Sequence, residues 1–299
     1  MSAHTLDHSR CHVVDDGSGS LHLIDNGVDT DANWELLGSA LAAEGYGMRD
    51  VASITLTHLH HDHCGMTARI VRESGAIVRM HQSDARCLHE QRTYRQPQAV
   101  ETLLQAWGVP QAMRPEVRVA AVQRISEVAP FVVGVPLQGG EVLASGALAW
   151  RVLHVPGHTA GHIVIADDDA RTLYSGDHLL PGVTPGVGLG ERIDGDDPMG
   201  DYLGALERTA VFDDYEVHPG HGAPFRGARH RGEQIRARHL ARGRDVAAIV
   251  TAAPGARVWD VARALRWRGG FADLRGTALL SALAQTEMHI RRADSQEMT

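Results

Sequence analysis

The chain has 299 residues, of which 43% are hydrophobic and 22% are charged, and its formal net charge is −8 at pH 7. These values are ordinary for a globular protein with a large core, and they argue against a disordered or fibrous chain. No stretch approaches the roughly 18 apolar residues of a membrane helix, and the polar N-terminus lacks the apolar region of a signal peptide. Three scattered cysteines exclude a disulfide framework, so we expect a cytoplasmic protein without a membrane partner.

The charges are unevenly distributed along the chain. All 29 basic residues are arginines, so mechanisms that need a lysine nucleophile are excluded. Residues 224–299 contain fourteen arginines and seven acidic residues, a balance of +7, which leaves −15 for the rest. A basic region of this kind is compatible with nucleic-acid binding. We favour the alternative, in which a basic helical region packs against an acidic domain.

The first elements are predicted as a β-hairpin, a helix and a buried strand. The turn Asp16–Gly19 separates two β-branched runs, Cys11–Asp15 and Leu21–Asp25. Asn33–Glu44 has the apolar spacing of a helix, and Val51–Thr57 that of a buried strand.

Helices and strands continue to alternate, which favours a layered architecture. A helix at Cys64–Ser74 and a strand at Ile77–Met80 come next. The segment Ser83–Pro130 is helical in pattern and without strands, so it is predicted to be an insertion between sheet elements.

Strands return in the second half, at Leu148–Val155, Ile163–Ala166 and Arg171–Ser175. Pro181–Gly200 is rich in Gly, Pro and Asp and is predicted to be a long loop, a feature that is often functional. After His221 the pattern is almost wholly helical.

A dense group of histidines, THLHHDHCG at residues 57–65, begins where a buried strand ends. Side chains two residues apart in an extended chain share a face, so His58 and His60 can reach one metal ion. Asp62 and His63 lie on the turn beyond and can reach a second ion. Imidazole and carboxylate are ligands of Zn²⁺ and similar ions. Four ligands cannot surround two ions, so others must come from elsewhere.

Three more strand ends carry such residues: PGHTAGH at 156–162, SGDH at 175–178 and HPGHG at 218–222. Each places one candidate just beyond a strand, namely His158, Asp177 or His221, among glycines that allow the backbone to come close.

Together the four motifs, HxHxDH, GHTxGH, SGD and PGHG in this order within residues 11–225, resemble the metallo-β-lactamase superfamily. The resemblance implies two divalent metal ions, with zinc favoured and iron or manganese as alternatives. The implied ligands are His58, His60 and His158 for the first ion, Asp62, His63 and His221 for the second, and Asp177 as a bridge between them.

The resemblance also implies the fold and the domains. The expected class is α+β, a four-layer αββα sandwich with the site at one edge. The expected catalytic domain covers residues 11–225, with a helical insertion at about 83–130. Residues 226–299 are expected to form a C-terminal helical domain, which resembles the winged-helix-like end of one branch of the superfamily that includes glyoxalase II-like hydrolases.

Two metal ions that share a water can provide hydroxide at neutral pH, so the implied activity is hydrolysis by a metal-bridging hydroxide, with Asp62 and Asp177 as the catalytic carboxylates. We favour a thioester or another small ester or lactone as substrate. Class B β-lactamases lack the carboxylate that Asp177 provides, whereas the glyoxalase II-like thioesterases, lactonases and ribonucleases of the superfamily keep it, so Asp177 argues against a β-lactamase. The alternative is an endoribonuclease, and an iron-dependent persulfide dioxygenase or a β-lactamase ranks lower.

The segments 83–130 and 181–200 are expected to form the walls of the pocket. Apolar residues such as Leu103 and Trp107, with Arg86, Arg92 and Arg95, would suit an apolar acyl group on an anionic carrier. The alternative is that these residues only pack the insertion. We therefore expect a small-molecule acyl substrate, favour it over nucleic acid, and leave a homo-oligomer open.

Two neighbouring features are expected to support the ligands. His162 closes the GHTxGH motif and is predicted to orient its loop by hydrogen bonds instead of binding metal. The segment Asp25–Gly27 stands where many members of the family have Asp-Thr-Gly and is predicted to be a buried turn beneath the site.

Overall fold

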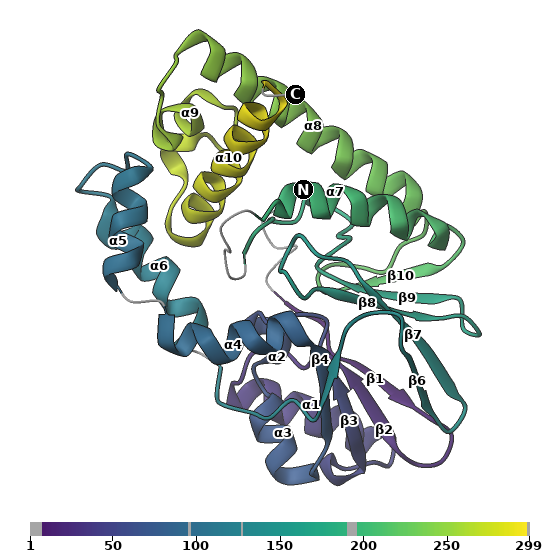
Figure 1. Cartoon of the computed structure of the whole chain (residues 1–299). Coiled ribbons are helices and arrows are strands. Elements are labelled where there is room, and N and C mark those ends of the chain that lie inside the picture. Colours follow the sequence, from purple (N-terminus) through teal and green to yellow (C-terminus); the bar gives the residue numbers. More distant parts are fainter. Residues whose placement is uncertain (1–7, 95–96, 127, 190–195, 298–299) are drawn as a thin grey trace.

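A computed structural model describes residues 8–94, 97–126, 128–189 and 196–297. Its strands form two five-stranded sheets (Figure 1). The first sheet has the order β1-β2-β3-β4-β5 and consists of β1 (His12–Asp15), β2 (Leu21–Ile24), β3 (Val51–Thr55), β4 (Ile77–His81) and β5 (Val135–Leu137). The second has the order β10-β9-β8-β7-β6 and consists of β6 (Val142–Ser145), β7 (Leu148–His154), β8 (Ile163–Asp167), β9 (Thr172–Gly176) and β10 (Glu216–Pro219).

Strand direction differs between the sheets. In the first, β1 and β2 form the predicted antiparallel hairpin, and β2 to β5 are parallel. In the second, β6 to β9 are antiparallel and β10 is parallel to β9. The carboxyl ends of β3, β9 and β10, like that of β7, lead into the ligand motifs, so the topology brings these motifs to one edge.

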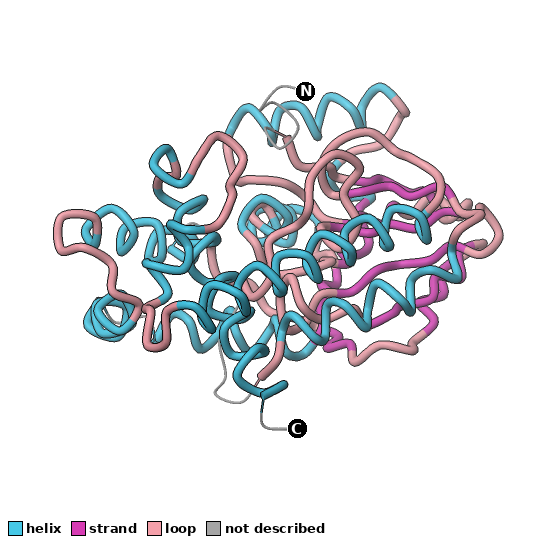
Figure 2. The backbone as a smooth tube through the Cα atoms, turned by 90° about the horizontal axis from the view of Figure 1, so that it is seen from above, coloured by secondary structure: helices cyan, strands magenta, loops and turns pink. Residues whose placement is uncertain are grey.

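Helices cover the outer faces of both sheets (Figure 1). Those of the first half are α1 (Asp31–Ala43), α2 (His61–Cys64), α3 (Thr67–Ser74), α4 (Gln82–Tyr94), α5 (Pro97–Ala106) and α6 (Arg114–Ser126). Those of the second half are α7 (Pro198–Thr209), α8 (Ala228–Ala252), α9 (Val258–Ala264) and α10 (Gly276–Glu297). Short 3-10 helices lie at η2 (Met48–Asp50), η3 (Ala210–Phe212) and η4 (Phe271–Asp273). In Figure 2 the strands gather at one end of the molecule and an all-helical part occupies the other.

The two sheets pack face to face through apolar side chains. Ile24 of β2 packs with Trp150 of β7 and Ile165 of β8, and all three are buried. Leu37 and Ile70, from α1 and α3, pack on the outer face of the first sheet, and helices α7 and α8 cover the second. The predicted αββα sandwich is therefore confirmed.

Strands β5 and β6 were not expected from the sequence, because three or four residues with one proline show little periodicity. Helix α7 begins at Pro198, inside the segment predicted as a loop to Gly200. Its start has two recognisable signals. Asp197 Oδ1 accepts the Gly200 N–H at 2.9 Å, and Pro198 occupies the first turn.

The C-terminal helices share their core with the second sheet. Leu206 of α7, Ile235 of α8 and Leu283 of α10 belong to one buried cluster with Val164 and Val217 of the strands. The predicted helical character of this region is confirmed. In the described residues, no helix is both long and apolar enough to cross a membrane.

Candidate metal centre

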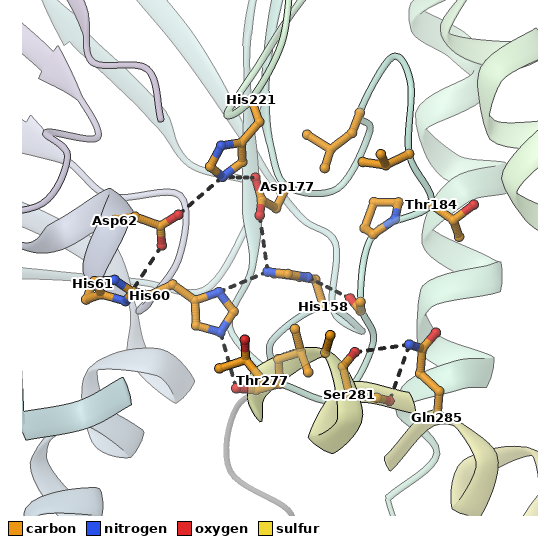
Figure 3. Close-up of a pocket in the computed structure, with 16 residues that line it drawn as sticks. His60, His61, Asp62, His158, Asp177, Thr184, His221, Thr277, Ser281 and Gln285 are labelled. Atoms are coloured by element: carbon orange, nitrogen blue, oxygen red, sulfur yellow. Dashed lines mark hydrogen bonds and ion pairs between the residues drawn. The ribbon is translucent and has the colours of Figure 1, made fainter. Parts of the chain in front are cut away.

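The first group of ligand candidates consists of three histidines from two loops. His58 and His60 follow β3, and His158 follows β7. Figure 3 shows how His60 and His158 lie. His58 Nε2 lies 2.9 Å from His60 Nδ1, and His158 Nε2 lies 3.0 Å from the same atom. One nitrogen of each ring thus faces a common point.

The outer nitrogens of His158 and His60 face backbone carbonyls. His158 Nδ1 lies 2.7 Å from Gly186 O, and His60 Nε2 lies 3.2 Å from Leu189 O. A carbonyl oxygen can only accept, so each outer nitrogen carries the ring hydrogen. In the neutral ring the inner nitrogen then has no hydrogen and presents its lone pair.

His58 has the same arrangement, through a hydroxyl group. Its Nδ1 lies 3.0 Å from Thr57 Oγ1, and that hydroxyl donates its own hydrogen to Asp25 Oδ2 at 2.7 Å. Burial, together with the neighbouring histidines, lowers the pKa of His58 well below its usual value, so the ring is neutral. Three lone pairs therefore point at one spot, where a metal cation can accept all of them and a hydrogen bond cannot.

The second group consists of Asp62 and His63 from α2 and His221 from the loop after β10. His221 Nε2 lies 3.2 Å from Asp62 Oδ2, and His63 Nε2 lies 3.8 Å from the same oxygen. The outer nitrogens again meet acceptors: His63 Nδ1 is 2.8 Å from Asp25 Oδ2, and His221 Nδ1 is 2.9 Å from the carbonyl of His8. The inner nitrogens both face carboxylate oxygens, and a ring that has lost its second proton presents a lone pair there.

Asp177 lies between the two groups. Its Oδ1 is 3.5 Å from both His63 Nε2 and His221 Nε2, and its Oδ2 is 3.6 Å from His158 Nε2. His63 Nε2 and Asp177 Oδ1 are buried without a hydrogen-bond partner among the described residues. Burial lowers the pKa of His63, but the surrounding carboxylates, Asp177 foremost, outweigh it and raise this pKa to about 10. The point between these groups therefore attracts positive charge, and the residues fit a metal ion.

The predicted buried turn at Asp25–Gly27 lies directly beneath the ligands. Asp25 has a φ of 56°, in the left-handed region that Asp tolerates better than most residues. Its Oδ1 accepts the Thr57 N–H at 2.8 Å, in addition to the bonds from Thr57 Oγ1 and His63. One carboxylate thus orients ligand candidates of both groups.

His162 supports the backbone of Asp177, which lies on another loop than the one that His162 was predicted to orient. Its Nε2 accepts the Asp177 N–H at 3.1 Å, and its ring stacks on His58 with centroids 4.8 Å apart. His162 is fully buried and belongs to none of the groups that could hold a metal among the described residues.

Asp84 is a supporting residue that the sequence analysis missed. It lies in the first turn of α4 and is fully buried. Its Oδ2 accepts from the Leu59 N–H at 3.0 Å and from the Thr159 hydroxyl at 2.7 Å, and its Oδ1 accepts from the Gly161 N–H at 2.6 Å. Asp84 therefore joins the loop of His58 and the loop after β7. Nothing in its local sequence indicates this, because its partners lie 25 to 77 residues away.

A cavity of about 380 Å³ opens over the metal-binding groups (Figure 3). Its floor contains His60, Asp62 and Asp177, and His61 also lines it. Apolar residues of the segment after β9 form one side: Leu180, Val183, Pro185 and Leu189. The opposite side is formed by α10 through Thr277, Ala278, Ser281 and Gln285.

The expectation for the pocket walls is therefore correct only in part. The segment from residue 181 lines the cavity, but no described residue of the insertion 83–130 does so. Leu103 and Trp107 instead pack in the core, and Arg86 is exposed on α4. The side chain of Arg92, and Arg95 altogether, lie outside the described residues. The apolar residues therefore serve packing, as in the alternative, although their core is shared with the second sheet and the C-terminal helices.

A four-layer sandwich with two sets of His and Asp side chains at one edge is typical of metal-dependent hydrolases. A family model described as the metallo-β-lactamase superfamily matches residues 4–251. The chain therefore belongs to the metallo-β-lactamase superfamily. Its structure is similar to that of a metallo-β-lactamase family protein from Thermus thermophilus, with a TM-score of 0.79 and 26% identity, covering 97% of this chain and 89% of that one.

Several curated proteins are similar in sequence. The probable metallo-hydrolase YqjP of Bacillus subtilis is 28% identical over 69% of this chain and 65% of its own length. The acyl-coenzyme A thioesterase MBLAC2 of Bos taurus is 30% identical over 64% of this chain and 62% of its own length. A hydroxyacylglutathione hydrolase of Rhodopseudomonas palustris is 37% identical over 29% of this chain and 32% of its own length. The chain thus spans less than two thirds of each of these relatives.

Proposed function

We propose that the chain is a binuclear metallo-hydrolase that acts on a thioester or another small ester. In this proposal His58, His60 and His158 hold one divalent ion, and Asp62, His63 and His221 hold the other, with Asp177 shared between them. The observation that carries it is the convergence of five inner ring nitrogens, whose outer nitrogens are all held by acceptors, with carboxylate oxygens on two adjacent points. Mixed imidazole and carboxylate ligands favour zinc, with iron or manganese as alternatives.

Bound divalent ions supply Lewis acidity, which polarises an ester carbonyl and lowers the pKa of water. The chain's own residues then have distinct roles. Asp62, which is partly exposed in the pocket, accepts a hydrogen bond from the attacking water and so orients it. Asp177 is buried and keeps the two ligand groups at a fixed separation.

The composition of the pocket favours a leaving group that needs no protonation. Among the described lining residues, His61 is the one ionisable side chain outside the proposed ligand set. A thiol has a pKa near about 8.5, so a thiolate can leave without a dedicated proton donor, whereas an amine cannot. The names of two relatives, an acyl-coenzyme A thioesterase and a hydroxyacylglutathione hydrolase, agree with this substrate class.

A hydrolysis screen with elemental analysis tests the proposal. The substrates are acyl-thioesters, lactones, a cephalosporin, bis-p-nitrophenyl phosphate and RNA. We expect close to two metal ions per chain and turnover of a thioester or small ester well above that of the others. One iron per chain with oxygen consumption on a persulfide, and no ester hydrolysis, would refute the proposal.

A further inference from the structure

The segment His8–Arg10 joins the two sheets next to the second group of ligand candidates. It leads into β1 of the first sheet, and it lies against the loop that carries His221 after β10 of the second sheet. Ser9 forms an antiparallel bridge with His221, and the backbone N–H of Arg10 donates to Gly220 O at 2.9 Å. A ligand candidate that follows one sheet is thus held by a segment that precedes the other.

The loop of His221 also touches the metal centre itself. A Cβ atom on Gly220 would be 2.6 Å from Asp177 Oδ1 and 2.6 Å from His63 Cε1, so a side chain does not fit there without displacing a ligand candidate. The Gly220 N–H donates to Gly176 O at 2.8 Å. The position of this loop therefore decides where the ring of His221 lies relative to the other ligand candidates.

The segment orients the ring of His221 through a backbone carbonyl. His221 Nδ1 donates to His8 O at 2.9 Å. Its Nε2 then faces Asp62 Oδ2 at 3.2 Å and Asp177 Oδ1 at 3.5 Å (Figure 3). Rotation of the ring would break the bond to the carbonyl and turn Nε2 away from both carboxylates. An outer hydrogen bond of this kind fixes the orientation and the tautomer of a metal-binding histidine.

The side chain of Arg10 holds the same loop beyond His221. Arg10 Nε donates to Gly222 O at 2.6 Å, whereas its backbone N–H bonds to Gly220 O. One residue thus holds the loop both before and after His221. Arg10 is half-buried, so water competes less for the bond to Gly222 O than it would at the surface.

We propose that the segment His8–Arg10 is a positioning element for the metal ion of the second group, because it holds His221 in place as a ligand. The inference rests on the proposed function. The ion of the first group should not depend on the segment, since the outer nitrogens of its histidines meet other acceptors. These acceptors are Thr57 Oγ1 for His58, Leu189 O for His60 and Gly186 O for His158.

A pair of deletions tests the proposal. The variant that lacks residues 2–9 loses the carbonyl of His8, whereas the variant that lacks residues 2–7 keeps the whole segment and has the same terminal charge. In competition with a chelating dye, the Kd of one of two Zn²⁺ ions should rise about 10- to 100-fold in the first variant, the usual effect of losing a group that orients a metal ligand. The Kd of the other ion, and both values in the second variant, should stay within about threefold. Anomalous diffraction should locate the retained ion among His58, His60 and His158.

Arg10→Lys tests the segment without a deletion. The positive charge remains but the Nε donor to Gly222 O is lost, so the Kd of the second ion should rise about 3- to 10-fold, as for the loss of one hydrogen bond. A purely electrostatic role of Arg10 predicts no change. Arg49→Lys, at an exposed arginine of η2, is the matched control and should change neither Kd.

Unchanged affinity for both ions in Arg10→Lys and in the variant that lacks residues 2–9 would overturn the inference, and so would equal weakening of both ions. Hydrogen exchange of the metal-free protein separates the inference from the proposed function. Residues 216–225 should exchange faster in the variant that lacks residues 2–9 than in the wild type. If the wild type binds fewer than two ions, the proposed function fails and exchange decides: faster exchange supports the positioning role, and unchanged protection of this loop excludes it.

Discussion

Each proposed ligand histidine is held by a second hydrogen bond that decides which nitrogen faces the metal. For His158 and His60 the partner is a backbone carbonyl, and for His63 it is the carboxylate of Asp25. Such outer partners fix the ring orientation and the tautomer. At the scale of single residues, the site is therefore preorganised by the protein, and its ligands can be tested one at a time.

Asp177 is the proposed shared ligand, and its removal should affect both ions. Asp177→Ala and His60→Ala should each reduce hydrolysis to background, with little loss of fold, because both residues lie in loops beyond strand ends. Asp177→Ala should in addition lower the content of both metal ions, since it is the ligand proposed to touch both. Metal analysis and circular dichroism measure this. Two retained ions and near-normal turnover in Asp177→Ala would contradict the bridging assignment.

Asp84 should make stability depend on pH. Burial raises its pKa to about 6, although hydrogen bonds from Thr159, Gly161 and Leu59 act in the opposite direction. The usual pKa of an unfolded Asp is about 3.9, so between that value and 6 the native state holds a proton that the unfolded chain has lost. The contribution of Asp84 is therefore fully present below about pH 4 and is lost as pH rises through 6.

Comparison with Asp84→Asn isolates this effect, because the histidines titrate in both proteins. The free energy of unfolding of the wild type minus that of the variant should fall between about pH 4 and about pH 6.5, by up to about 3 kcal/mol. Denaturant unfolding at several pH values measures it. A difference that is constant or rises with pH would show that the buried carboxyl group is not protonated in this range.

At the scale of elements, helix α8 holds the apolar side of the cavity in place. Arg231 of α8 is buried and donates from Nε to Leu180 O at 2.6 Å and from Nη2 to Val183 O at 2.5 Å. The segment that lines the pocket after β9 is therefore tied to a long helix, and its carbonyls obtain donors that it cannot provide itself.

Arg231→Met should loosen this segment without changing the metal ligands. It keeps much of the side-chain volume but leaves one buried and one partly buried carbonyl without a donor, so we expect stability to fall by about 1–3 kcal/mol. KM for a small ester should rise several-fold while metal content is unchanged. Arg226→Met is the matched control, because Arg226 is exposed and donates to one carbonyl, that of Asp214. Equal effects of the two substitutions would argue against a specific role of Arg231.

At the scale of the whole molecule, the C-terminal helices and the second sheet share one hydrophobic core. Leu283 of α10 and Ile235 of α8 pack in the same cluster as Tyr202 of α7 and Val217 of β10. We keep the division of the chain near residue 225 as a proposal about its organisation. Because the core is continuous across this boundary, the two parts depend on each other for stability.

Calorimetry should accordingly show a single cooperative unfolding transition for the full chain. Two separable parts would each need a core of their own, whereas these parts bury their apolar faces against each other. Equal calorimetric and van't Hoff enthalpies are the measurement. Two resolved transitions would show that residues 226–299 fold independently.

The basic C-terminal region should have no part in hydrolysis of a small ester. Arg236 Nε lies 3.1 Å from Glu207 Oε1, and the guanidinium of Arg242 lies 4.2 Å above the ring of Trp267. These charges serve contacts within the chain, so kcat/KM on a small ester should change little with salt concentration. Small-ester hydrolysis should stay nearly unchanged when Arg236, Arg238, Arg242 and Arg244 are replaced by Gln. We expect no RNA cleavage above background in either protein.

An RNA substrate held by several arginines would behave differently. Its affinity would fall steeply with salt, by about 0.7 in log K per phosphate contact for each log unit. Salt-sensitive RNA cleavage that disappears in the four-arginine variant would favour the endoribonuclease alternative.

The layered α+β fold follows from the sequence alone, because short apolar runs specify buried strands such as Val51–Thr55. The sequence also determined the ligand candidates, because a histidine or aspartate that directly follows a strand is a local signal. The local sequence carries no signal for contacts between distant segments. Asp84 meets Thr159, and Ser281 lies beside Gly186, only because distant elements pack together. The tertiary structure alone decided which residues support the ligands and which helix closes the pocket, since a side chain's partner depends on packing between segments that periodicity cannot relate.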